Sequence, residues 1–284
     1  MIEENEKILD TNKNIAGKVV RVVVKNVTKR FCRKIKKIEK STLAKIVSLV
    51  SINESDKEFK ALNRVSFNIS AGEIFGMIGK NGSGKSTLLK IIAGVYSPDS
   101  GLVKTRGKLI YITGFGQGLK PKLTMKENIY LMGSVLGLSK TEIDKKLDKI
   151  VKFSGLKDYL YTKVDKFSSG MVTRLGFSIS IYCFSHHKPD ILIIDEAFGG
   201  GGDITFQDKA AKKMEELIKC GATVIMASHS LALVKKHCNR VVLLDKGKIV
   251  KEGNTGEVVD FYEDKMNKRR KQKIKKNNRP KKEA

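Results

Sequence analysis

The chain has 284 residues and carries 56 Lys and Arg against 30 Asp and Glu, a formal charge of +26. This length is enough for one large domain with its own hydrophobic core. The apolar runs are strand-sized, well short of the roughly 20 residues of a membrane-spanning helix, and the charged start of the chain lacks the apolar segment of a secretory signal. We therefore expect no membrane span and no secretion, but a globular protein of the cytosol.

The cysteines are scattered along the chain without CxxC or metal-ligand spacing. This usage suits a reducing compartment better than a disulfide framework. We expect structural thiols at the four positions, Cys32, Cys183, Cys220 and Cys238.

The positive charge gathers in two segments. Residues 265–284 hold eleven Lys and Arg and one Glu, and a second basic stretch runs from 29 to 40. We expect residues 263–284 to be a disordered basic tail that adds solubility. Anionic lipid headgroups and nucleic acid are the alternative partners, since a polybasic segment gains about 1 kcal/mol per Lys or Arg near an anionic membrane.

The chain begins with a polar, aperiodic segment, residues 1–18, which predicts a flexible leader. The β-branched run 19–27 predicts a strand. Apolar residues at helical spacing then predict an amphipathic helix at 31–52, within a helical insertion of about 31–57. Alternation of apolar and polar residues predicts the next strand at 61–69.

The rest of the chain alternates between strand and helix patterns. Short apolar runs predict strands at 73–78, 109–112, 191–194, 223–227 and 240–244, and helical spacing predicts helices at 86–93, 205–219 and 231–237. The Pro, Asp and Gly of 97–101 predict a turn. The pattern of about 123–185 is helical, which predicts a small helical sub-domain inserted into an α/β core.

A glycine-rich motif joins the strand predicted at 73–78 to the helix predicted at 86–93. It matches the pattern GxxxxGK[ST], in which backbone N–H groups close around phosphate oxygens and the new helix points its positive end at them. Lys85 would reach the β- and γ-phosphates of ATP, and Ser86 would bind Mg²⁺ between them. The predicted nucleotide-binding residues are Gly79, Lys80, Asn81, Gly82, Ser83, Gly84, Lys85, Ser86 and Thr87.

Two acidic residues follow the strand predicted at 191–194. Open parallel sheets place their ligand chemistry at the ends of strands. We therefore expect Asp195 to bind Mg²⁺ and Glu196 to act as the general base that polarises the attacking water.

One histidine has a comparable position. His229 follows the strand predicted at 223–227, where an imidazole can contact the γ-phosphate and sense its loss. The other three, His186, His187 and His237, have no such setting, and we expect them at the surface.

Between the phosphate loop and the acidic strand lies Phe167-Ser-Ser-Gly-Met-Val-Thr-Arg, a polar turn that opens a predicted helix. It resembles the signature motif of ABC transporter ATPases, in the variant found in exporters of surface polysaccharides. The resemblance covers residues of about 19–262. The segments 123–139, 202–209 and 244–253 are similar to the same polysaccharide branch.

This resemblance implies a fold of the α/β class: a P-loop NTPase core with a parallel-rich sheet, an antiparallel β part and an inserted helical sub-domain, within a cassette at 19–262. It implies a head-to-tail dimer in which Ser168, Ser169 and Gly170 of one copy cap the γ-phosphate bound by the other. It also implies integral membrane permease subunits as partners, and an aromatic side chain that stacks on adenine. Phe31 is the expected aromatic and Phe59 the alternative.

Two segments depart from the family pattern. Gln117 lies near the family's Mg²⁺-sensing glutamine, although the spacing to Pro121 puts Phe115 at that place. The glycine-rich run after Glu196 is one residue longer than the family's D-loop, whose aspartate would be Asp203.

The resemblance implies an ATP-hydrolysing subunit that sits on the inner face of the cell membrane and drives export of a lipid-linked surface polysaccharide through separate membrane subunits. The alternative is an ATPase that acts on nucleic acid or ribosomes, which a single cassette without long heptads disfavours. A third possibility is a scaffold that binds nucleotide without hydrolysis. The full set of Lys85, Ser86, Asp195, Glu196 and His229 disfavours it.

Overall fold

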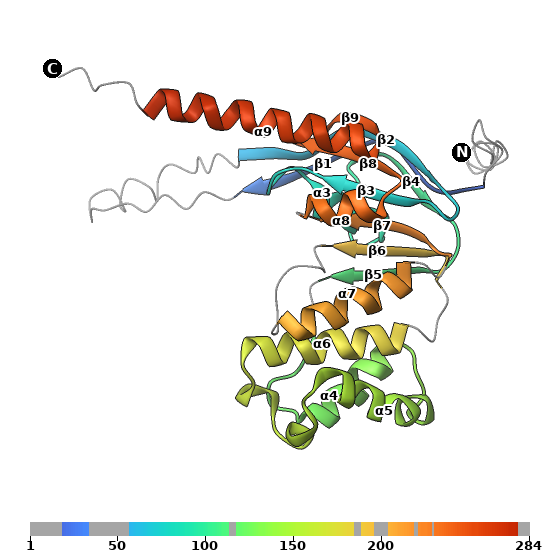
Figure 1. Ribbon diagram of the computed structural model, residues 1–284. Helices are drawn as coiled ribbons and strands as arrows, with labels where there is room; N and C mark the ends of the chain where they lie inside the picture. Colours follow the sequence, from blue (N-terminus) through green and yellow to red (C-terminus); the bar gives the residue numbers. More distant parts are fainter. Residues whose placement is uncertain are drawn as a thin grey trace, which may run out of the picture.

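The computed structural model describes residues 19–33, 57–113, 118–184, 189–195, 204–218, 221–228 and 230–277. These residues form two β-sheets and a layer of helices that lies below them in Figure 1. The expected leader, residues 1–18, and residues 34–56 of the expected insertion lie outside the described residues.

The smaller sheet is antiparallel, with strand order β2-β1-β4. Its strands are β1 Val20–Arg33, β2 Lys57–Ser70 and β4 Ser100–Thr105. Apolar side chains of β1 and β2, such as Val22, Leu62 and Ile69, are completely buried. One face of this sheet therefore belongs to the core.

Two predictions about this sheet are wrong. The helix predicted from residue 31 does not begin there, because β1 continues to Arg33 and Phe31 pairs across the ladder with Phe59. Their rings lie 5.8 Å apart, and such aromatic pairs stabilise neighbouring strands. The turn predicted at 97–101 is shorter than expected, since β4 begins at Ser100 and pairs with Thr28 of β1.

The larger sheet has strand order β5-β6-β7-β3-β8-β9. Its strands are β3 Ile74–Ile78, β5 Leu109–Thr113, β6 Ile191–Asp195, β7 Thr223–Ala227, β8 Arg240–Asp245 and β9 Lys248–Asn254. All neighbours are parallel except β8 and β9. Because parallel strands end at the same edge of a sheet, the ends of β3, β6 and β7 lie side by side.

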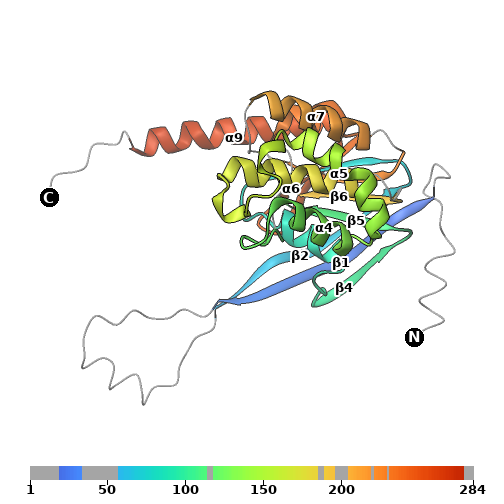
Figure 2. The ribbon, with the colours of Figure 1, turned by 90° about the horizontal axis from the view of Figure 1, so that it is seen from below.

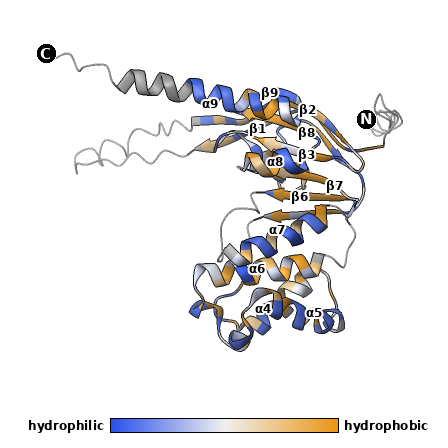
Figure 3. Cartoon of the chain, viewed as in Figure 1, coloured by the Kyte–Doolittle hydropathy of each residue, from blue (hydrophilic) through white to orange (hydrophobic). Residues whose placement is uncertain are grey.

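Helices cover both faces of the larger sheet. The helix α3 Lys85–Ile92 lies between the two sheets, with Leu88 and Leu89 completely buried among residues of both. The helices α7 Ile204–Ile218 and α8 Leu231–His237 cover the opposite face. The central strands β6 and β7 are apolar except for Asp195 at the end of β6 and Thr223 at the start of β7, and Figure 3 colours most of both strands as hydrophobic, as expected for strands buried on both faces.

Three helices form a separate layer with a core of its own: α4 Met125–Val135, α5 Lys140–Ser154 and α6 Ser169–Phe184. Figure 2 shows this layer from below, in front of the sheets. Capping boxes at Thr124 and Ser139 begin α4 and α5. Phe177 and Ile181 of α6 also join the core under the larger sheet, so α6 connects the two parts.

The last helix, α9 Thr255–Asn277, corrects the prediction of a disordered tail from residue 263. Val258 and Val259 are completely buried and fix the start of the helix. Lys, Arg and Gln are good helix formers, and adding a residue to an existing helix is far easier than nucleating a new one. The basic sequence therefore continues as a helix to Asn277, and residues 278–284 lie outside the described part of the chain.

Within the described ranges, no helix is long and apolar enough to cross a membrane. The longest of these helices, α9, is largely hydrophilic where Figure 3 colours it.

Candidate functional site

The glycine-rich loop between β3 and α3 is held against backbone on two sides. Gly79 has φ of 146°, and a Cβ built there would lie 2.2 Å from Leu244 O. Gly84 has φ of 108°, and its Cβ would lie 2.6 Å from Ala61 O. Only glycine fits at these two positions, so the motif spacing fixes the path of the loop.

Lys85 is the first residue of α3, and its side chain turns back over the loop. Lys85 is 4% exposed, and its Nζ donates hydrogen bonds to Gly79 O at 2.9 Å and Lys80 O at 3.3 Å. The N-cap residue Gly84 supplies no side-chain acceptor for the first N–H groups of α3. A buried ammonium and the uncapped positive end of a helix therefore meet in one loop, which is the chemistry of an anion site.

The hydroxyl of Ser83 gives a second indication of a ligand. Ser83 is 3% exposed, and its Oγ has no hydrogen-bond partner within the part of the chain that the structure describes. Buried hydroxyls rarely lack partners, and an oxygen-rich ligand in the loop would supply one.

The loop reaches the acidic strand through Ser86. Ser86 Oγ donates to Asp195 Oδ1 at 3.2 Å, and Tyr111 of β5 donates its phenolic hydroxyl to Asp195 Oδ2, also at 3.2 Å. Burial, with the Asp195 charge as a second cause, raises the pKa of Tyr111, so this hydroxyl remains a donor. The Ser86 hydroxyl and the Asp195 carboxylate are hard oxygen donors of the kind that Mg²⁺ prefers.

Sequence reasoning missed Tyr111. The signal was present in part, because Tyr111 lies in the strand predicted at 109–112. Only the pairing of β5 with β6, in which Tyr111 lies opposite Ile193, shows that its ring can reach Asp195.

The residues of the signature-like motif begin α6 in the helical layer. Ser168 Oγ accepts a hydrogen bond from Met171 N at 3.2 Å, and both Ser168 and Ser169 are exposed. Figure 1 shows α6 on the far side of β5 and β6 from α3. The motif therefore presents the beginning of a helix to the outside rather than to the phosphate loop of its own chain.

Four of the candidate positions lie outside the described residues: Glu196, His229, Gln117 and Asp203. The strands before two of them are described. Asp195 at the end of β6 lies opposite Ala227 at the end of β7, and Ala227 lies opposite Met77 of β3. The strands that precede Glu196 and His229 in the chain therefore end at the edge of the sheet where the phosphate loop begins.

The two aromatic candidates, Phe31 and Phe59, belong to one cluster. The ring of Tyr96 meets Phe31 edge-on at 5.8 Å, so three aromatic side chains lie together beside the end of β1. Phe59 is 50% exposed and Tyr96 37% exposed, which leaves ring surface open to a planar ligand. Tyr96 was not predicted as part of this group.

One histidine and one cysteine differ from prediction. The His237 side chain at the end of α8 is 8% exposed, because it packs beside α7, where its Nε2 lies 3.7 Å from Glu215 Oε1. Cys32 is exposed, whereas Cys183 and Cys238 are buried as expected. His186, His187 and Cys220 lie outside the described residues.

A phosphate loop after a central parallel strand, with its Ser hydrogen-bonded to an acidic residue at the end of another strand, defines a protein of the phosphate-loop NTPase class. Comparison with known proteins makes the class more specific. The family model "ABC transporter" matches residues 62–199. The chain is 37% identical to the O-antigen export system ATP-binding protein RfbB of Klebsiella pneumoniae over 210 residues, which cover 74% of this chain and 83% of that protein. The chain belongs to the ABC transporter family.

Two other relatives are longer proteins. The chain is 39% identical to the ABC transporter protein AbcA of Aeromonas salmonicida, over 72% of this chain and 65% of that one. It is 38% identical to the teichoic acids export ATP-binding protein TagH of Bacillus anthracis, over 86% of this chain and 42% of that one. The chain thus spans less than two thirds of the length of these two relatives.

Solved structures agree with the fold. An ATP-binding subunit of an ABC transporter matches with a TM-score of 0.61 at 24% identity, over 82% of this chain and 90% of that one. The cassette MJ0796, in a dimeric structure bound to ADP and Pi, also matches with a TM-score of 0.61, at 23% identity, over 82% and 98% of the two chains. The predicted α/β cassette fold is confirmed.

Proposed function

We propose that this chain is the ATP-binding and ATP-hydrolysing subunit of an ABC exporter. The observation that carries the proposal is the hydrogen bond between Ser86 and Asp195, which joins the phosphate loop to the acidic strand in a chain of this family.

The nucleotide would lie with its phosphates on Gly79–Thr87. The Ser83 hydroxyl, which has no partner among the described residues, fits a phosphate chain, as do the buried Lys85 ammonium and the beginning of α3. Ser86 and Asp195 fit Mg²⁺, which would neutralise charge that develops on the phosphates. For adenine, the exposed ring surface of the cluster that contains Phe31, Phe59 and Tyr96 offers a stacking platform.

Hydrolysis requires a group that orients water. We assign Glu196 as the general base and His229 as the γ-phosphate contact, with Gln117 near the metal. The sheet register, which brings the ends of β3, β6 and β7 to one edge, supports the first two assignments.

A second copy of the chain would complete the site. Ser168, Ser169 and Gly170 begin a helix whose end is exposed, and the N–H groups there are suited to an anion held by another molecule. A head-to-tail dimer would place this helix end over the γ-phosphate of the partner. Among the solved structures, the MJ0796 cassette has been described as a dimer.

The substrate and the membrane partners follow from the relatives. RfbB and TagH are named as ATP-binding proteins of O-antigen and teichoic acid export. We therefore place this chain on the inner face of the cell membrane, bound to integral membrane permease subunits that move a lipid-linked surface polysaccharide. Its basic C-terminal segment would add attraction to anionic lipid headgroups. These relatives do not favour the alternative of an ATPase acting on nucleic acid.

Two experiments test the proposal. Purified protein should hydrolyse ATP only with Mg²⁺, Lys85→Ala should lose ATP binding, and Glu196→Gln should retain binding but trap a closed dimer. Lys140→Ala, at an exposed position at the start of α5, is the control and should behave as wild type. Unchanged turnover in Glu196→Gln would remove the assignment of the base.

The second experiment is purification of the tagged chain from detergent-solubilised membranes. Co-purification of a polytopic membrane protein is the expected result. Recovery of RNA or ribosomes without such a protein would contradict the exporter assignment while leaving the ATPase assignment intact.

A further inference from the structure

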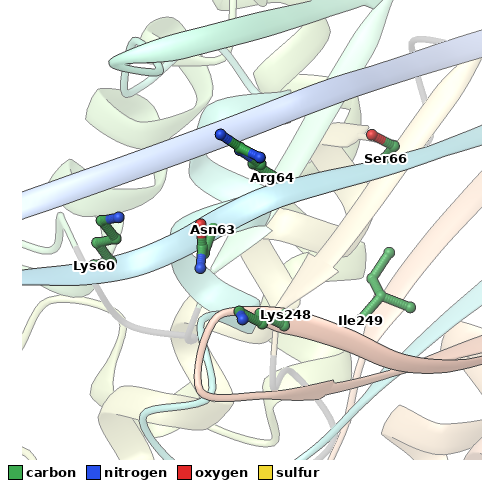
Figure 4. Close-up of a pocket in the computed structure, with 6 residues that line it drawn as sticks. All are labelled: Lys60, Asn63, Arg64, Ser66, Lys248 and Ile249. Atoms are coloured by element: carbon green, nitrogen blue, oxygen red, sulfur yellow. The ribbon is translucent and has the colours of Figure 1, made fainter.

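A cationic groove lies between the two sheets at β2 and β9. It has a volume of about 560 Å³ and is lined by Lys60, Asn63, Arg64, Ser66, Lys248 and Ile249 (Figure 4). Three of these residues are cations and none is acidic. The groove volume is in the range of small-molecule sites, about 300–1,000 Å³.

The charges of the three cations are not balanced by any partner among the described residues. Within the described ranges of the chain, the side chains of Lys60, Arg64 and Lys248 have no ion pair and no hydrogen bond. The side-chain amide of Asn63 also has no hydrogen bond there. Single exposed lysines are often unpaired. Here, however, three cations that have no counter-charge among the described residues line one groove, and an anion bound between them would reduce any repulsion among their charges.

The backbone holds these residues in place. Between Val27↔Val65 and Lys29↔Leu62, β2 contains one residue more than β1, so Asn63 and Arg64 form a bulge. Arg64 has a φ of 53° although it is not glycine, and its N–H donates to Thr28 Oγ1 at 3.2 Å. A non-glycine residue in this conformation is strained, and such residues cluster at ligand-binding positions.

The lining residues also have firm supports. Ser66 is fixed by Asn26, whose backbone N donates to Ser66 Oγ at 2.8 Å. Asn63 N of β2 donates to Gly247 O at 2.8 Å, which joins β2 to the opposite wall, the hairpin that carries Lys248. The two walls of the groove are therefore one connected backbone structure.

The groove shares no lining residue with the nucleotide site proposed above, neither with the phosphate loop 79–87 nor with the cluster of Phe31, Phe59 and Tyr96. Lys60 follows Phe59 in β2, so the groove adjoins the proposed adenine platform. We propose that this groove binds a phosphate group of a second ligand, through Lys60, Arg64 and Lys248 with the Asn63 amide as a further donor. The chemistry of a guanidinium and two ammonium groups suits a phosphate better than a neutral solute.

A phosphate group could come from a free phosphate ester or from a lipid headgroup, and two probes distinguish these sources. The soluble probe is glycerol phosphate, titrated by calorimetry. The membrane probe is vesicles of phosphatidylglycerol and phosphatidylcholine, compared with phosphatidylcholine alone in a sedimentation assay. Both use the full chain saturated with Mg²⁺ and a non-hydrolysable ATP analogue, so that the phosphate loop is occupied.

The groove variant combines Lys60→Gln, Arg64→Asn and Lys248→Gln. Asn is chosen at 64 because it tolerates positive φ. The control variant changes three exposed lysines of α5, Lys140, Lys145 and Lys149, to Gln, which removes the same charge. Each groove substitution is also measured alone, in case the combined variant does not fold.

We expect the groove variant to bind one of the probes about tenfold more weakly than wild type, since charge-assisted hydrogen bonds to a phosphate are lost. The control should match wild type. A loss with glycerol phosphate identifies a free ester, and a loss with vesicles alone identifies a headgroup. If the groove and control variants bind both probes equally, or wild type binds neither, the proposal is wrong. The affinity for the ATP analogue, measured alongside, reports separately on the proposed nucleotide site.

Discussion

Ser86 and Asp195 lie 109 positions apart in the chain, yet Ser86 Oγ is 3.2 Å from Asp195 Oδ1. The contact exists because α3 begins at the end of β3 and because β6 ends at the same edge of the parallel sheet. It connects the two motifs on which the proposed Mg²⁺ site depends.

Asp195→Asn should weaken Mg²⁺ binding, because an amide supplies one neutral oxygen in place of a carboxylate. We expect the rate of ATP hydrolysis to fall by about a hundredfold. In electron paramagnetic resonance, the Mn²⁺ concentration that gives half of the bound signal of the nucleotide complex should rise. Asp148→Asn, at an exposed position on α5, is the control. A wild-type metal requirement in Asp195→Asn would exclude this residue as a ligand.

Tyr111→Phe should act on the same carboxylate more mildly. The variant loses one hydrogen bond to Asp195, which contributes about 1 kcal/mol. We expect the Mg²⁺ concentration for half-maximal nucleotide binding to rise about fivefold. Tyr161→Phe, at a 73% exposed position, should leave it unchanged. An effect on folding stability with no shift in the Mg²⁺ midpoint would show that Tyr111 does not position Asp195.

A comparison of Gly84→Ala with Gly82→Ala distinguishes the effect of a steric clash on stability from the effect of an unfavourable backbone conformation in the same loop. Both glycines have positive φ, but a Cβ at Gly84 would clash with Ala61 O, whereas a Cβ at Gly82 meets nothing within 4 Å. Gly82→Ala should lose about 1 kcal/mol of folding free energy, and Gly84→Ala should lose roughly twice as much or more. Thermal unfolding in the absence of nucleotide measures both. Equal losses would show that the Ala61 backbone can move away.

The cysteines should differ in reactivity. Burial raises the pKa of the Cys183 thiol to about 11 and that of the Cys238 thiol to about 12, well above the ordinary range of a thiol. Since the thiolate is the reactive form, Cys32 should react first with a disulfide reagent at pH 8, and Cys183 and Cys238 only after unfolding. Peptide mass spectrometry identifies the labelled positions. Fast labelling of Cys238 in folded protein would contradict its burial.

The same pKa shifts predict how stability depends on pH. The two buried thiols ionise more easily in the unfolded chain, so their contribution is complete below about pH 9 and is lost as the pH rises toward 11–12. Denaturant unfolding across this range should give a falling free energy. A Cys183→Ala, Cys238→Ala variant should show a smaller slope.

Much of the strand and helix order could be read from the sequence. Strands with continuous apolar runs, such as β6 and β7, are recognisable because both of their faces are buried. The sequence pattern did not predict elements whose conformation depends on contact with another part of the chain. The strand β9 alternates exposed and half-buried residues and forms only because it pairs with β8, and the basic part of α9 is helical because its beginning is anchored.

Some features of the candidate site could likewise be predicted from the sequence, whereas others depend on the tertiary structure. The spacing of glycines with Lys85 and Ser86 specifies the phosphate loop, because backbone angles and helix ends are local properties. The sequence alone therefore determined the family and the loop. Only the tertiary structure decided that Tyr111 reaches Asp195, that Phe31, Phe59 and Tyr96 share one cluster, and that three cations line a single groove. These contacts depend on sheet register and on the bulge in β2, which join residues far apart in the chain and leave no local pattern.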